Sequence, residues 1–87
     1  MPYSLTLPAA LASQGWKVKI REDERLEPPH VTIIRGLSTW RISLRTGAYL
    51  DRKPDPSDVP GAVRAQVDSA MTTLVTEWNA KYPSNPV

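Results

Sequence analysis

The chain has 87 residues, carries a net charge of +2 from 11 basic and 9 acidic residues, and contains no cysteine. This length predicts one domain with one modest core, and the lack of cysteine excludes a disulfide framework and a thiolate metal site. No basic segment followed by an apolar one opens the chain, and no apolar run has membrane-spanning length. We therefore expect a soluble, cytoplasmic protein of bacterial type with no membrane partner.

Residues 7–15 predict a short helix. Pro8 suits the first helical turn, the alanines favour helix, and Gly15 suits the left-handed position that ends one. At about two turns, such a helix forms only when it packs against other elements.

The middle of the chain has the pattern of an antiparallel sheet. Residues 16–21 and 39–45 alternate apolar and polar side chains, which is typical of half-buried strands. Between them, a polar loop over 22–29 leads into a strand over 30–35 and a turn at Gly36. Thr46 and Gly47 predict a tight turn into a short fourth strand at 48–50.

A proline-rich loop over 51–58 precedes the longest predicted element, a helix over 59–82. Pro60 begins it, Pro83 ends it, and residues 83–87 are expected to be a loose tail. Its apolar residues recur at the three- and four-residue spacing of a helix that buries one face: Val63, Val67, Ala70, Met71, Leu74, Val75, Trp78 and Tyr82.

These elements predict a single α+β domain over residues 1–87. The expected architecture is a two-layer sandwich in which the long C-terminal helix covers the apolar face of an antiparallel sheet. That sheet has three to four strands within 16–51, and the short N-terminal helix lies beside it. The three tryptophans are in phase with the apolar faces of their elements, so we expect them in the core.

Five cations fall on the predicted solvent side of two strands, and we call this set the basic face. It can follow a phosphate backbone or meet an acidic protein, or it can be a solvated surface paired with the acidic loop 22–27. No aromatic side chain is interleaved with the cations, which argues against stacking on single-stranded RNA. The basic face consists of Lys17, Lys19, Arg21, Arg41 and Arg45.

His30 is the only histidine, and it follows Pro28 and Pro29 at the start of a strand. Histidine titrates near neutral pH and serves as a general base. Beside Arg41 or Arg45, which would stabilise a charged phosphate, it is a candidate for cleaving RNA through the 2′-hydroxyl. The alternative is a structural histidine that hydrogen-bonds to the backbone.

The acidic residues of 22–27 are interpreted as a solvated hairpin loop. Calcium-loop spacing is absent, and His30 alone offers an imidazole, so we predict no metal site. The glycines form no phosphate-binding loop and the chain has no nucleophile elbow, so no cofactor is expected.

Segments 27–31, 40–50 and 74–79 resemble a small uncharacterised bacterial family. Its members carry a Pro-Pro-His-x-His-Val-type motif, a strand ending in Thr-Gly-x-x-Leu, and a terminal helix ending near a Trp-Asn or Trp-x pair. The second histidine of the motif falls on Thr32 here. This resemblance implies a small protein encoded beside a partner, in the manner of toxin–antitoxin modules.

A weaker resemblance is to the HicA-type ribonuclease toxins. It rests on Gly15-Trp16 at the entry to the first strand and on His30 in the second, with Pro28-Pro29 in place of the Gly-Ser of those toxins.

Together, the sequence predicts a small intracellular interaction domain rather than an enzyme. It would bind a protein or RNA partner through the basic face. The alternative is an RNA-cleaving toxin with His30 as general base.

Overall fold

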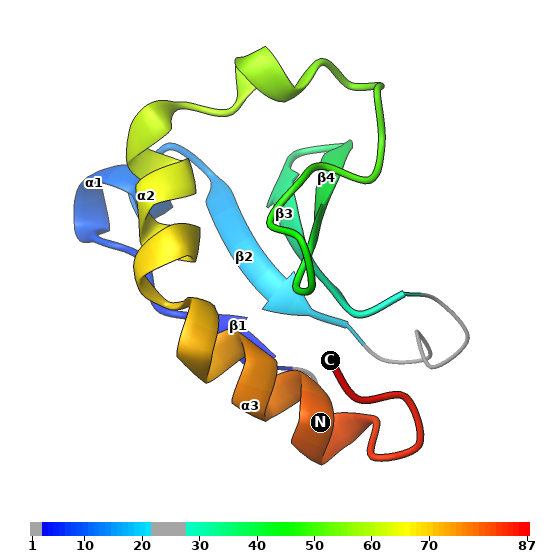
Figure 1. The fold of residues 1–87 in the computed structure, drawn as a ribbon. Helices are drawn as coiled ribbons and strands as arrows, with labels where there is room; N and C mark the ends of the chain where they lie inside the picture. Colours follow the sequence, from blue (N-terminus) through cyan, green and yellow to red (C-terminus); the bar gives the residue numbers. More distant parts are fainter. Residues whose placement is uncertain (1–2, 22–27) are drawn as a thin grey trace.

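The computed structural model describes residues 3–21 and 28–87, which form a four-stranded antiparallel sheet and a set of helices (Figure 1). The α+β class expected from the sequence is confirmed. The strands lie side by side in chain order, and the bounds are β1 Tyr3–Leu5, β2 Trp16–Ile20, β3 His30–Arg35 and β4 Ser38–Ser43. The helices are α1 Ala9–Ser13, the 3-10 helix η1 Pro56–Asp58, α2 Gly61–Ser69 and α3 Met71–Lys81.

Alternation along the strands gives the sheet one apolar and one polar face. Residues directly opposite each other in antiparallel strands point to the same side, and Val18 lies opposite Ile33, which lies opposite Trp40. The apolar face therefore carries the buried side chains of three strands: Trp16, Val18, Ile20, Val31, Ile33, Trp40 and Ile42.

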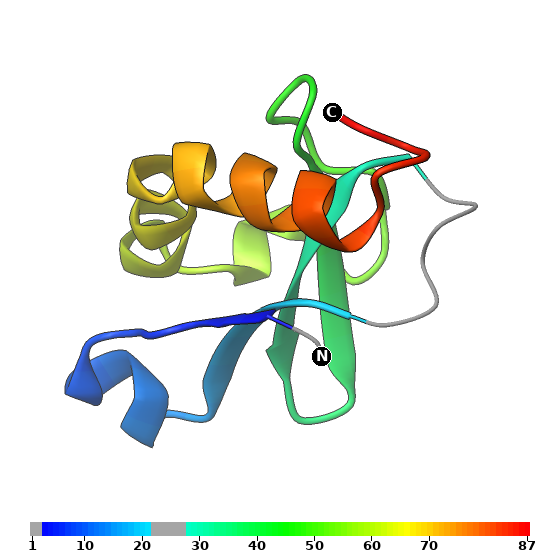
Figure 2. The same cartoon turned by 90° about the horizontal axis from the view of Figure 1, so that it is seen from below.

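Helices α2 and α3 follow one another along this apolar face (Figures 1 and 2). They contribute Val63, Val67, Leu74 and Trp78 to the core, each fully buried. Burying one large apolar side chain contributes about 1.5–3 kcal/mol, so these four side chains are a main source of stability in so small a domain.

The fourth strand lies elsewhere than predicted. Residues 48–50 form an isolated bridge, with Tyr49 opposite Ile42, rather than a strand. The sheet is instead completed by β1, which pairs with β2 and precedes the helix α1. Three residues are too few for an alternating pattern, and β1 depends on the edge of β2 for its hydrogen bonds, so sequence periodicity did not reveal it.

The single long helix predicted over 59–82 is found only in part, because two consecutive helices, α2 and α3, occupy that range. Ala70 separates α2 from α3 with φ −100° and ψ 8°. Val67 and Leu74, on either side of the break, are seven residues apart, which is close to two full turns. The apolar stripe therefore stays in phase across the break, and its periodicity contains no sign of it.

The C-terminal residues 83–87, expected to be a loose tail, fold back on the domain. The indole Nε1 of Trp78 donates to the Asn85 carbonyl at 2.7 Å, and the Val87 amide donates to Asn79 Oδ1 at 2.8 Å. Arg45 Nη2 donates to the Pro86 carbonyl at 2.9 Å. The tail is thus tied both to α3 and to the chain after β4.

The predicted acidic loop 22–27 lies outside the described residues. Within residues 3–21 and 28–87, no helix is long and apolar enough to cross a membrane.

Candidate functional site

The register of the sheet places Lys19 and Arg41 on one face. Lys19 lies opposite Thr32 on β3, and Thr32 lies opposite Arg41 on β4, so the three side chains form a row across the polar face. Lys17 lies two residues before Lys19 and points to the same side. The register assigns five further strand residues to this face, and only His30, which is fully buried, carries an aromatic ring: Ser4, His30, Ile34, Thr39 and Ser43.

Three cations of the basic face belong to β2 and the residue after it. Lys17 and Arg21 are exposed, and Lys19 is half-buried. Within the described part of the chain, the side chains of these three residues make no hydrogen bond or ion pair.

Arg41 is held by an internal carboxylate. Its Nε lies 2.8 Å from Asp51 Oδ2, and its Nη2 lies 2.8 Å from Oδ1. These hydrogen bonds are the main reason why the pKa of Asp51 lies below its ordinary value of 3.8; desolvation opposes the shift, and the charges of Arg41 and His30 add to it. The pair neutralises most of the charge that Arg41 would bring to the polar face.

Arg45 is exposed and follows β4. Its guanidinium donates to the Pro86 carbonyl, so it faces the C-terminal tail rather than the row formed by Lys19 and Arg41. The structure thus brings Lys17 and Lys19 together on β2, with Arg21 directly after it, and assigns structural contacts to Arg41 and Arg45.

His30 is fully buried at the start of β3. Its Nδ1 lies 2.8 Å from the Pro28 carbonyl, which can only accept, so Nδ1 carries the proton. The ring packs against the Trp78 indole, with centroids 5.5 Å apart and planes at 51°. The other ring nitrogen, Nε2, is buried as well. This environment anchors the Pro-Pro lead-in to α3 and keeps the imidazole away from a dissolved substrate.

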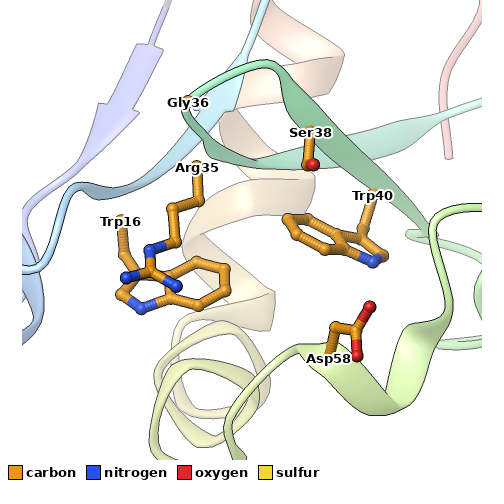
Figure 3. Close-up of a pocket in the computed structure, with 6 residues that line it drawn as sticks. All are labelled: Trp16, Arg35, Gly36, Ser38, Trp40 and Asp58. Atoms are coloured by element: carbon orange, nitrogen blue, oxygen red, sulfur yellow. The ribbon is translucent and has the colours of Figure 1, made fainter.

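A pocket that the sequence did not predict opens where the β3–β4 hairpin turns (Figure 3). Its volume is about 550 Å³, and it combines two buried indoles with one guanidinium and one carboxylate. We call it the tryptophan pocket, and its lining residues are Trp16, Arg35, Gly36, Ser38, Trp40 and Asp58.

Both walls of the tryptophan pocket are fixed by contacts. The Arg35 guanidinium lies 5.3 Å from the centroid of the Trp16 ring, and its Nε donates to the Gln14 carbonyl at 3.1 Å. The Trp16 and Trp40 rings are 5.6 Å apart with planes at 40°. In Figure 3 the guanidinium lies against Trp16, while the Asp58 carboxylate points toward Trp40 from the opposite side.

The backbone carbonyl of Asp55 fixes the position of the segment that carries Asp58. The Asp55 carbonyl accepts from Trp40 Nε1 at 3.0 Å and from the Asp58 amide at 3.0 Å. Asp55 Oδ1 also accepts from the Ser57 amide at 2.9 Å, which closes the turn into η1. The buried indole of Trp40 therefore positions the segment that carries Asp58.

One signal of this pocket was present in the sequence. Arg35 continues the apolar alternation of Val31 and Ile33, so it is a charge at an inward-facing position of a strand. Asp58 gave no such signal, because it reaches the pocket through a proline-rich loop without periodicity.

Among the described residues, no three His, Asp or Glu side chains gather as a metal site would require. Comparison of the chain with protein-family models, curated proteins and solved structures finds no match.

Proposed function

We propose that this protein is a small interaction domain that binds the phosphate backbone of a nucleic acid through its basic face. The observation that carries the proposal is the line of Lys17, Lys19 and Arg21, whose side chains have no partner within the described part of the chain. Alternate residues of a strand are about 6.6 Å apart, so this line presents a positive charge at regular intervals.

The chemistry of the face favours nucleic acid over an acidic protein. Protein interfaces depend on a few large anchors, such as Trp, Tyr or a buried Arg. The polar face of the described strands carries no exposed aromatic side chain, and its arginine, Arg41, is already paired with Asp51. Phosphate contacts require only positive charge, and they are insensitive to base sequence.

The test is the salt dependence of binding to short duplex DNA and duplex RNA, followed by fluorescence anisotropy. Three phosphate contacts predict a log–log slope of about −3 for duplex DNA. Each of Lys17→Gln, Lys19→Gln and Arg21→Gln should weaken binding and reduce the slope by about 1. Lys81→Gln is the matched control, because it removes the same charge from α3, on the other layer of the domain.

Equal effects of Lys81→Gln and the three β2 substitutions would show that only the net charge matters, which contradicts the proposal. No binding at low salt would contradict it too, and would direct the search to an acidic protein. The same samples report on the ribonuclease alternative, since RNA cleaved by the protein and spared by His30→Asn would replace this proposal.

A further inference from the structure

We propose that the tryptophan pocket binds a small zwitterion, a ligand that carries both a carboxylate and a protonated amine, as a free amino acid or a short peptide does. The site is separate from the basic face, because Arg35 shares the apolar side of the sheet with Ile33, whereas Lys17 and Lys19 point to the polar side.

The first element of the proposal is the guanidinium of Arg35. Its Nε donates to the Gln14 carbonyl, and its Cζ lies 5.3 Å from the centroid of the Trp16 ring. Within the described residues, neither terminal nitrogen donates a hydrogen bond. A guanidinium fixed in this way presents a fork of donors that matches a carboxylate.

The second element is the carboxylate of Asp58 on the opposite wall. Its backbone is held by the Asp55 carbonyl, while its side chain makes no hydrogen bond or ion pair in the described part of the chain. Arg35 and Asp58 line one pocket and yet form no ion pair with each other. Each charge therefore remains open to a ligand group of opposite sign.

The two charges together select the ligand class. A simple anion would be attracted by Arg35 and repelled by Asp58, and a simple cation would meet the reverse. A zwitterion satisfies both walls at once, and Trp16 and Trp40 line the same pocket with the little surface that they expose. The pocket is an open depression of about 550 Å³, so a ligand would stay partly in solvent while it contacts both charges.

The experiment uses triglycine and two blocked forms as probes. Triglycine has both charges, N-acetyl-triglycine has only the carboxylate, and triglycine amide has only the ammonium. Titrations are followed by shifts of the backbone amides of Arg35, Gly36 and Asp58 and of the Trp16 indole proton. We expect triglycine to shift these signals in the millimolar range. Either block should weaken binding about tenfold or more, the loss that one charge-assisted hydrogen bond implies.

Two substitutions assign each charge to its wall. Arg35→Gln should bind triglycine and triglycine amide equally, because the variant lacks the guanidinium that would bind the ligand carboxylate. Asp58→Asn should bind triglycine and N-acetyl-triglycine equally, because the variant lacks the carboxylate that would bind the ligand ammonium. Lys81→Gln on α3 is the control, and its affinities should match those of the unaltered protein.

The proposal is overturned if triglycine leaves the pocket signals unchanged, or if all three probes bind equally well. It is also overturned if guanosine monophosphate binds more tightly than triglycine and loses affinity in Asp58→Asn, since the pocket would then recognise a nucleobase edge. A negative result in the triglycine titrations would not bear on the salt-dependent binding of nucleic acid to the basic face, so the two proposals are tested independently.

Discussion

Arg41 and Asp51 form a bidentate ion pair, in which both nitrogen–oxygen distances are 2.8 Å. The pair fastens the segment after the Tyr49 bridge to the side of β4, where the Leu50 amide also donates to the Arg41 carbonyl at 2.8 Å. The backbone and the side chain of Arg41 thus hold the same piece of chain, which explains why residues 48–51 lie along β4.

Asp51→Asn should lower the free energy of unfolding at neutral pH and make no difference in strong acid. The folded pKa of Asp51 lies below the ordinary 3.8, so its ionised form stabilises the fold above that value. This stability is lost as the pH falls through the folded pKa. Urea unfolding of both proteins at neutral pH and at about pH 2 measures the effect.

The matched control for this prediction is Asp58→Asn, whose carboxylate makes no bond in the described residues and whose loss should not change stability at either pH. An Asp51→Asn deficit that is the same at both pH values would show that the ionised pair is not its cause.

Trp78→Ala should lower the free energy of unfolding by about 3–5 kcal/mol. The side chain is fully buried, and its ring lies 4.4 Å from that of Tyr82 and 5.5 Å from that of His30. Trp78→Phe keeps most of the apolar volume but loses the donor to the Asn85 carbonyl. It should therefore cost less, and should raise hydrogen exchange in residues 83–87. An unchanged melting midpoint for Trp78→Ala would contradict this account of the core.

The His30 side chain is expected to stabilise the folded domain. His30→Ala removes both a ring packed on Trp78 and the donor to the Pro28 carbonyl, and should cost about 2 kcal/mol. His30→Asn keeps a donor close to the backbone and should cost less. Chemical denaturation of the two variants gives the comparison, and equal losses would mean that the hydrogen bond to Pro28 contributes nothing.

The sequence predicted the parts of the fold that follow a local period. Alternation from Trp16 to Ile20 and from Trp40 to Leu44 indicated β2 and β4 and their buried residues, because a strand with one covered face has to alternate. The parts it missed depend on contacts between distant segments. Strand β1 needs the edge of β2, and the turn at Ala70 leaves the helical stripe in phase.

The candidate sites divide in the same way. The cations of β2 could be predicted, since alternation alone sends them to the polar face. The pairing of Arg41 with Asp51 and the approach of Asp58 to Arg35 could not, because both acids lie in the proline-rich loop after residue 50, whose course is set by tertiary contacts such as Trp40 Nε1 to the Asp55 carbonyl.

Replacing glycine by alanine should have opposite effects on the stability of the domain at Gly36 and at Gly61. Gly36 turns the β3–β4 hairpin with φ +59°, whereas Gly61 begins α2 without a left-handed backbone, and an added Cβ meets nothing within 4 Å at either position. Gly36→Ala should therefore destabilise the domain by about 1–2 kcal/mol, purely through backbone strain. Gly61→Ala should stabilise it by about 0.4–1 kcal/mol, because alanine restricts the unfolded chain. Thermal and urea unfolding of both variants decide the sign, and a stabilising Gly36→Ala would mean that the hairpin turn is not left-handed at this residue.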